Sequence, residues 1–298
     1  MNARLKADLS RLTAVTVGQV THDRYGDRIV PGGCAFFGAR TFQGLGAVSK
    51  LLTTVGEDFS CESGLVGLDV RREVSPETTV FSNLYPPGEP RLQLVESRSQ
   101  KITESMYPDE WKRPDLLFIA PVMGEMDAIP WASIARAGYT TVGLQGFMKK
   151  ASDERRDGKA VVVALDHPLG FELLEGVDAV FLSKEDIELF GSSDLLEQLR
   201  SRVGVVVVTL GEAGCAVYEG EKERRLGVYT TDAVDPTGAG DTFASATSLA
   251  LAARWDVIDA ARLGAGAASV VVEADGGETL DRVGEGLDRM DAISMVGP

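Results

Sequence analysis

Histidine and cysteine are scarce in this chain of 298 residues. It has two histidines, and its three cysteines are scattered as Cys34, Cys61 and Cys215. Two histidines are too few for a histidine-based metal cluster. Three cysteines, an odd number without regular spacing, do not form a disulfide framework. We therefore expect reduced thiols and a cytoplasmic protein.

Long apolar runs and basic blocks are also missing. Apolar stretches such as residues 161–165 and 205–208 are far too short to span a bilayer, and residues 1–12 lack the apolar segment of a signal peptide. Acidic residues outnumber basic ones 45 to 30, for a formal net charge of −15. Because nucleic-acid binding requires a basic face, we expect neither a nucleic-acid partner nor a membrane partner.

What the chain does contain is an alternation of apolar strand-like runs and helix-like segments. With 44% hydrophobic residues, it is long enough for one large core, so we expect a single domain over residues 1–298. Alternating βα units predict a three-layer α/β/α sandwich with a mostly parallel central sheet. The expected strands are residues 14–18, 51–55, 116–120, 140–144, 161–165, 179–182 and 205–210, and the expected helices include 62–68, 128–137, 192–200, 260–272 and 281–290.

Two segments do not fit a parallel sheet. Residues 20–31 contain a Tyr25-Gly26-Asp27 turn between short extended pieces, and residues 77–97 alternate apolar and polar residues on both sides of a proline-rich turn. Both patterns are typical of antiparallel hairpins. The simplest use of such hairpins in a βα chain is a small β-lid over the site.

The stretch Val234-Asp235-Pro236-Thr237-Gly238-Ala239-Gly240-Asp241-Thr242-Phe243 lies between a strand-like and a helix-like segment. Two glycines two apart permit a sharp bend, and the N–H groups that begin a helix can cradle an anion. An acid there can take the proton of a nucleophile that attacks a phosphate. The alternative is that Asp241 only complements the helix dipole and that the glycines only form a tight turn.

This stretch closely resembles the C-terminal signature of the ribokinase-like (pfkB) carbohydrate kinases. The resemblance extends over about residues 14–275 and implies a ribokinase-like fold, a phosphotransferase with an alcohol acceptor, and ATP and Mg²⁺ as cofactors. It implies Asp241 as the catalytic base and the amides of Gly238, Ala239 and Gly240 as the anion hole. A homodimer formed through the lids is a further expectation.

The resemblance also implies substrate-binding residues. Asp23 matches an acid near the end of the first strand, and Gly32 and Gly33 match a G-G-x-A-x-N-x-A pattern. Phe37 occupies the position of the asparagine, which favours an apolar wall against a ring, although a core phenylalanine is the alternative. Arg91 matches an arginine after the lid turn, and a surface position is its alternative. Gln145 and Asp166 are candidates on other grounds, because they follow expected strands and α/β sheets bind ligands at the carboxyl ends of their strands.

Two further motifs are implied to face the donor. Thr209, Gly211 and Gly214 match a T-x-G-x-x-G turn along the nucleotide, which Thr237 joins, and a plain turn between strands is the alternative. Ser183 and Asp186 stand where the family has N-x-x-E, which organises magnesium through water. A helix-capping box explains this pair equally well.

Within the family, the myo-inositol kinases look most similar. Similar features are His22-Asp23, Phe37, Thr78–Phe81 and Val142–Gly146. We therefore predict transfer of the γ-phosphate of ATP to a hydroxyl of a cyclic polyol, myo-inositol. The alternatives are a sugar or nucleoside acceptor, or a non-catalytic protein that binds a small ligand. A Walker-type G-x-x-x-x-G-K-[ST] loop is absent.

Overall fold

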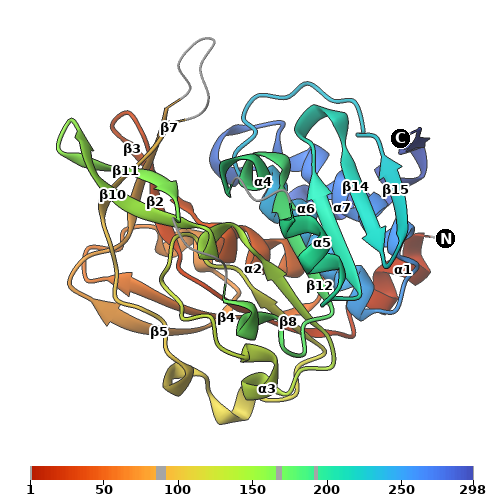
Figure 1. The fold of residues 1–298 in the computed structure, drawn as a ribbon, viewed down its shortest axis with the longest axis horizontal. Helices are drawn as coiled ribbons and strands as arrows, with labels where there is room; N and C mark the ends of the chain where they lie inside the picture. Colours follow the sequence, from red (N-terminus) through yellow and green to blue (C-terminus); the bar gives the residue numbers. More distant parts are fainter. Residues whose placement is uncertain (1, 85–91, 166–169, 191–193, 298) are drawn as a thin grey trace.

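A ten-stranded mixed sheet forms the centre of the molecule in this computed structural model (Figure 1), which describes residues 2–297 except 85–91, 166–169 and 191–193. The order is β16-β15-β14-β13-β12-β9-β8-β1-β4-β5. Neighbours from β13 to β5 are parallel, and β14, β15 and β16 are antiparallel additions at one edge. The strands are β1 (Thr13–Val17), β4 (Val48–Gly56), β5 (Asp69–Ser75), β8 (Leu116–Ile119), β9 (Thr140–Gly143), β12 (Ala179–Ser183), β13 (Val205–Thr209), β14 (Cys215–Glu219), β15 (Lys222–Leu226) and β16 (Met295–Val296).

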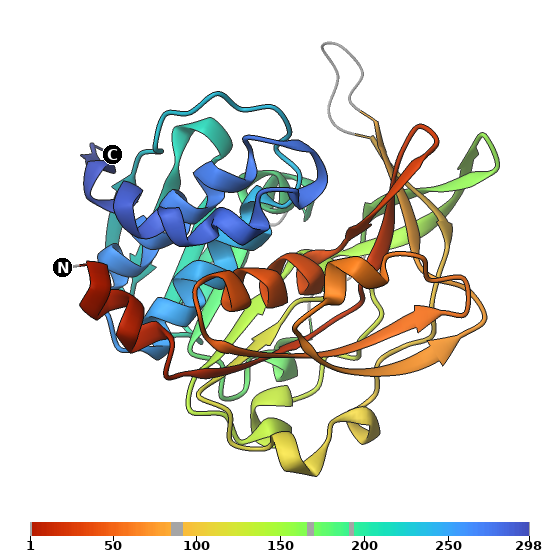
Figure 2. The same cartoon turned by 180° about the vertical axis from the view of Figure 1, so that it is seen from behind.

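Long helices cover one face of this sheet (Figure 2), and short helices cover the other (Figure 1). The first group is α2 (Cys34–Gly44), α6 (Ala239–Ala252) and α7 (Val257–Val271), with α1 (Asn2–Leu9) and α8 (Gly286–Arg289) beside them. The second group includes α3 (Trp131–Ala135), α4 (Lys184–Phe190) and α5 (Leu195–Arg200). Short 3-10 turns complete the fold: η1 (Glu62–Leu65), η2 (Glu104–Met106), η3 (Asp109–Trp111), η4 (Gln145–Phe147), η5 (Phe171–Leu174), η6 (Gly211–Ala213), η7 (Asp275–Gly277), η8 (Leu280–Glu285) and η9 (Met290–Ala292).

The strands alternate between two hydrophobic cores because successive side chains point to opposite faces. In β8, Leu116 and Phe118 join the core beneath the long helices, whereas Leu117 and Ile119 join the core beneath the short ones. All four side chains are at most 1% exposed. The predicted three-layer sandwich with a mostly parallel sheet is confirmed. None of the helices in the described ranges has the length and apolar character needed to cross a membrane.

A separate six-stranded sheet projects beside the central one (Figure 1), in the order β10-β11-β7-β6-β2-β3. Its strands are β2 (Thr21–Tyr25), β3 (Arg28–Gly32), β6 (Val80–Leu84), β7 (Leu92–Ser97), β10 (Lys149–Arg156) and β11 (Lys159–Ala164). Both predicted hairpins are present, since β2 pairs with β3 and β6 with β7, each pair antiparallel. We call this second sheet the small sheet.

One predicted strand of the central sheet is wrong. Residues 161–165 were expected in the parallel sheet, but β11 pairs antiparallel with β10 and β7 in the small sheet. Asp157 and Gly158 join β10 to β11 with φ values of 51° and 79°. An Asp-Gly pair of this kind is a strong local signal for a hairpin. The apolar run therefore identified a strand but assigned it to the wrong sheet.

Some predicted helices are shorter than expected. The segment 62–68 forms only the 3-10 turn η1, and the last helix, predicted over 281–290, is divided among η8, α8 and η9. Short apolar segments carry little helical preference of their own, so packing decides their ends. Helix α1 has no counterpart among the predicted helices.

Candidate active site

Gly238 shapes the loop that leads into α6. It is the N-cap residue with φ 80° and ψ −5°, a left-handed conformation. A Cβ atom there would lie 2.1 Å from the ring of Phe37. The Ala239 amide donates to the carbonyl of Pro236 at 3.2 Å, but the amides of Gly238 and Gly240 have no hydrogen-bond partner in the described part of the chain. Two of the three amides implied as an anion hole are thus available to a ligand, and the third is engaged in the turn.

Asp235 fixes the conformation of this loop. Its Oδ1 accepts the Thr237 amide at 2.9 Å, and its Oδ2 accepts the Tyr25 hydroxyl at 2.8 Å and the Gly276 amide at 3.1 Å. Burial by itself raises the pKa of Asp235, but these hydrogen bonds outweigh it and hold the pKa below its usual range. Asp235 is therefore a charged anchor between the signature loop, β2 and η7.

Asp241 lies in the first turn of α6, against the start of α2. The thiol of Cys34, the first residue of α2, shares a hydrogen bond with the Asp241 side chain. Burial first, and then Asp241, raise the pKa of Cys34 well above its ordinary value, so the thiol stays protonated. Glu125 raises the same pKa and Lys149 lowers it. A carboxylate and a thiol thus meet where α6 and α2 begin, and Glu125 and Lys149 are close enough to influence the thiol.

The implied acceptor-binding residues lie at the same place. Asp23 is 6% exposed and accepts the Thr21 hydroxyl at 2.8 Å. A Cβ atom on Gly32 would lie 2.2 Å from the carboxyl carbon of Asp23, and one on Gly33 would lie 2.6 Å from the carbonyl oxygen of Gln19. Gly32 therefore lets the backbone approach Asp23, and Gly33 lets it approach Gln19, just before α2 begins.

The other implied substrate contacts are less open. Phe37 is 2% exposed and packs beneath Gly238, so it supports the signature loop and leaves little ring surface for a ligand. Gln145 begins η4, is half-buried, and its side chain has no hydrogen bond among the described residues. Arg91 and Asp166 lie outside the described residues.

The T-x-G-x-x-G motif forms the turn between β13 and β14. Gly211 and Gly214 have φ values of 61° and 92°, and a Cβ atom on Gly214 would lie 1.9 Å from the carbonyl oxygen of Leu226. Thr209 ends β13 and is paired with Ser183, the last residue of β12. The motif thus stands at the carboxyl end of the parallel strands, where α/β sheets bind ligands. The Thr237 hydroxyl is buried beside the Asp235 carboxylate and the Tyr25 hydroxyl.

Ser183 and Asp186 form a reciprocal cap at the start of α4. Asp186 Oδ2 accepts the Ser183 amide at 2.9 Å and its hydroxyl at 2.7 Å, and the Asp186 amide lies 3.0 Å from Ser183 Oγ. Asp186 Oδ1 faces the Lys149 ammonium at 3.4 Å. No group of three or more His, Cys, Asp or Glu side chains among the described residues is placed to hold a metal ion. These residues fit Mg²⁺ only through water, on an ion that the donor phosphates carry.

Sequence reasoning missed three residues of this site: Tyr25, Glu125 and Lys149. Glu125 is 2% exposed and accepts the amides of Val122 at 2.7 Å and Met123 at 2.8 Å. Burial raises its pKa despite these bonds. Glu125 and Lys149 each follow the carboxyl end of a parallel strand by a few residues, and that position was the available signal. For Tyr25 the sequence offered none.

Known proteins resemble this chain in sequence. The profile of the pfkB family of carbohydrate kinases matches residues 155–281. Inositol 3-kinase of Arabidopsis thaliana is 32% identical over 268 residues, which cover 84% of this chain and 69% of that protein. Cytidine kinase of Thermococcus kodakarensis is 27% identical over 251 residues, which cover 78% of this chain and 86% of that protein.

Solved structures resemble it in fold. A pyrophosphate-dependent kinase of the ribokinase family, in a sulfate complex, superposes with a TM-score of 0.76 at 21% identity, covering 93% of this chain and 99% of that one. Arabidopsis thaliana ribokinase in complex with ribose and ATP superposes with a TM-score of 0.70 at 19% identity, covering 94% of this chain and 98% of that one. The predicted ribokinase-like fold is confirmed. The chain therefore belongs to the pfkB family of carbohydrate kinases, and it is a phosphotransferase whose acceptor is an alcohol group of a small sugar, polyol or nucleoside.

Proposed function

We propose that this protein transfers the γ-phosphate of ATP to a hydroxyl of myo-inositol. The observation that carries the proposal is the position of Asp241, in the first turn of α6 and against the start of α2, just after Gly32 brings the backbone close to Asp23. The relative named inositol 3-kinase, at 32% identity, supports the choice of acceptor.

In this reaction Asp241 accepts the proton of the attacking hydroxyl. The hydroxyl oxygen forms a bond to the γ-phosphorus as the bond to the β-phosphate oxygen breaks, and ADP leaves. The free amides of Gly238 and Gly240 donate to the phosphoryl oxygens as charge develops on them. Ala239 contributes a third donor if its amide leaves the carbonyl of Pro236 during closure.

The remaining site residues orient the two substrates. Asp23, Gly32 and Gly33 hold acceptor hydroxyls, with Gln145 beside them and Phe37 supporting the loop from below. On the donor side the proposed contacts are Thr209, Gly211, Gly214 and Thr237. Mg²⁺ neutralises phosphate charge when bound, and Ser183 and Asp186 would reach it through water. The small sheet acts as a lid that excludes water.

Two relatives make the acceptor and the donor worth separating by experiment. One is named a cytidine kinase, and one fold neighbour is named a pyrophosphate-dependent kinase. The experiment combines each of two donors, ATP and pyrophosphate, with each of four acceptors, myo-inositol, ribose, fructose and cytidine. We expect the highest turnover with ATP and myo-inositol. Highest turnover with cytidine or a sugar would reassign the acceptor, and turnover with pyrophosphate alone would reassign the donor. Absence of turnover with every pair would favour a binding protein.

Replacing Asp241 tests the proposed base. Asp241→Asn should lower kcat about 10²- to 10⁴-fold and leave donor affinity nearly unchanged, because the amide cannot accept the proton. Asp232→Asn removes the same charge from an exposed position of the same loop and should keep full activity. Full activity of the Asp241 variant would remove this residue from the mechanism.

A further inference from the structure

Lys149 holds a nearly buried cation at the edge of the proposed site. It is the first residue of β10, directly after the turn that follows β9. Its ammonium lies 3.4 Å from Asp186 Oδ1, and the two side chains are 11% and 4% exposed. Burying two charges is costly and adds little to stability over an apolar pair. A functional reason for this ion pair is therefore worth seeking.

Asp186 is held in place to face this lysine. The Ser183 amide and hydroxyl both occupy Oδ2, at 2.9 Å and 2.7 Å, which leaves Oδ1 directed at Lys149. The pair lies at the carboxyl end of β12, beside the donor motif at the end of β13. The carboxylate thus fixes the ammonium on the donor side of the sheet.

The lysine also reaches the acceptor side. Its charge acts on the Cys34 thiol, which shares a hydrogen bond with Asp241 and lies within the field of Glu125. The loop that carries Glu125 is tied to the turn before Lys149, because the Gly124 amide donates to the Gly146 carbonyl at 2.7 Å. A backbone hydrogen bond therefore joins the loop of Glu125 to the segment that leads into Lys149.

A phosphate donor needs positive charge at this point. The charges of Asp241 and Glu125 both act on the Cys34 thiol, and Asp23 is a further, nearly buried carboxyl group of the proposed site. Backbone amides supply only partial charges, whereas an ammonium forms charge-assisted hydrogen bonds to phosphate oxygens. Lys149, which Asp186 holds beside the donor motif, is positioned to supply that charge.

We propose that Lys149 binds the transferring phosphoryl group of the donor and that Asp186 is a positioning residue that holds the lysine ready. This inference rests on the proposed kinase function. It assigns Asp186 a second role beside any water-mediated contact with magnesium. It also means that strand β10 of the small sheet, which begins with Lys149, contributes a phosphate ligand to the site.

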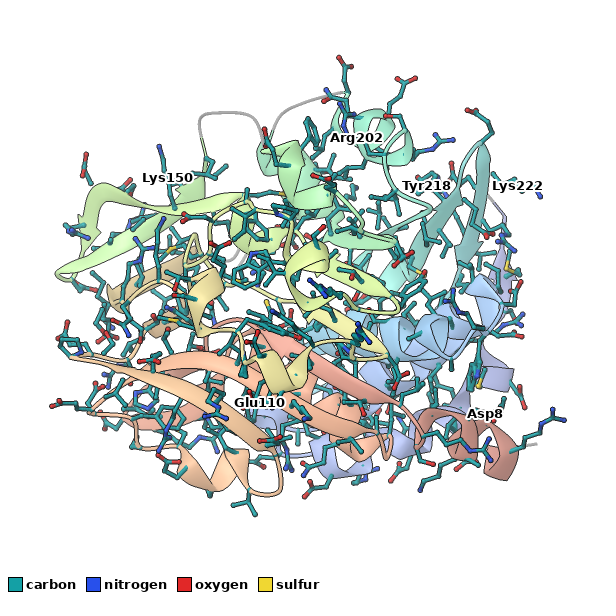
Figure 3. All side chains as sticks on the ribbon, turned by 90° about the horizontal axis from the view of Figure 1, so that it is seen from below. Asp8, Glu110, Lys150, Arg202, Tyr218 and Lys222 are labelled. Carbon is teal, nitrogen blue, oxygen red and sulfur yellow. The ribbon has the colours of Figure 1, made fainter. Side chains whose placement is uncertain are left out.

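The test compares Lys149→Met with Lys150→Met. We expect Lys149→Met to lower kcat/KM for the donor about 10²-fold or more and to leave the acceptor KM unchanged. Pyrophosphate affinity, measured by calorimetry with EDTA present, should fall about tenfold. Lys150, the next residue of β10, has its side chain at the outer edge of the molecule in Figure 3, and its replacement should change neither value.

Lys149→Met leaves the buried Asp186 carboxylate without its cation, which could destabilise the fold. The double variant Lys149→Met/Asp186→Asn removes both charges and is therefore tested as well. Circular dichroism checks that both variants fold. Lys149→Arg should recover part of the pyrophosphate affinity. If either folded methionine variant keeps pyrophosphate affinity and donor kcat/KM within about twofold of the wild type, the proposal is wrong. The two failures can be distinguished because the binding measurement needs no turnover. A wild-type protein that phosphorylates no acceptor would refute the kinase function, and the pyrophosphate affinities would still decide the role of Lys149.

Discussion

At the scale of a single residue, Gly238 shows why the signature requires glycine. Its φ of 80° is unfavourable for any residue with a side chain, and the ring of Phe37 fills the position of a Cβ atom. Gly240, two residues on, lies in the helix with nothing within 4 Å of the position its Cβ would take. The two glycines of the motif therefore have different physical roles.

Gly238→Ala should destabilise the protein by about 2 kcal/mol or more, from the left-handed backbone and the contact with Phe37 together. Gly240→Ala should be neutral or stabilising by about 0.5 kcal/mol, because alanine favours a helix. Urea unfolding of both variants measures the difference. Gly238→Ala/Phe37→Leu should regain part of the loss if the ring contact is real. Equal stability of Gly238→Ala and Gly240→Ala would contradict the different roles assigned to the two glycines.

At the scale of an element, the β2–β3 hairpin is fastened to the phosphate side of the site. The Tyr25 hydroxyl donates to Asp235 at 2.8 Å, and Arg28 pairs with Asp275 at 3.2 Å and Glu278 at 3.1 Å. Burial raises the pKa of Tyr25, so its hydroxyl remains a donor throughout the physiological range. The hairpin and the signature loop therefore hold each other.

Tyr25→Phe should destabilise the protein by about 1 kcal/mol, because a half-buried hydrogen bond to a charged acceptor is lost. It should also lower kcat several-fold, since Asp235 no longer fixes the loop before Gly238 as firmly. Arg28→Met in the same hairpin removes exposed ion pairs and a cation–π contact with the Tyr25 ring at 5.6 Å, so its cost should stay below that of Tyr25→Phe. Urea unfolding and steady-state kinetics report both effects. A larger loss for Arg28→Met than for Tyr25→Phe would reverse this ranking.

At the scale of the whole molecule, charge pairs join segments distant in sequence despite the net charge of −15. Glu273, just after α7, accepts the Thr231 hydroxyl at 2.7 Å and pairs with Arg289 at 2.8 Å and Arg282 at 3.0 Å. Arg289 first, and then Thr231, lower the pKa of Glu273 to about 2. This group links the segment before the signature to the C-terminal helices.

A carboxyl group with a depressed folded pKa contributes stability above its unfolded pKa and loses that contribution as pH falls through the folded value. For Glu273 this window extends from 4.5 down to about 2. Glu273→Gln should therefore be less stable than the wild type at about pH 6, and the gap should narrow at about pH 3. Urea midpoints at the two values measure it. As a control, Glu221→Gln at a fully exposed position should be as stable as the wild type at both pH values. If the stability difference between Glu273→Gln and the wild type is the same at both pH values, the pKa of Glu273 does not contribute to stability.

Local patterns were enough to predict the layers, both hairpins and the family. The strand-forming runs, the spacing of the glycines and the signature each depend on residues that are close together in the sequence, so the sequence alone is enough to identify them. The run at 161–165 shows the limit: its residues specify a strand, but the Asp157-Gly158 turn and the partners β10 and β7 place it in the small sheet. Phe37 shows the same limit, because only packing places its ring beneath Gly238.

The sequence alone determined the proposed base, Asp241, and its phosphate loop, because that chemistry lies within ten consecutive residues. Only the tertiary structure decided what surrounds them. Tyr25 and Asp235 are 210 residues apart, and no spacing rule brings them to 2.8 Å. Lys149 and Asp186 likewise meet only because different strands end at the same edge of the sheet. Contacts of this kind follow from the global packing of the chain, which local propensity does not encode.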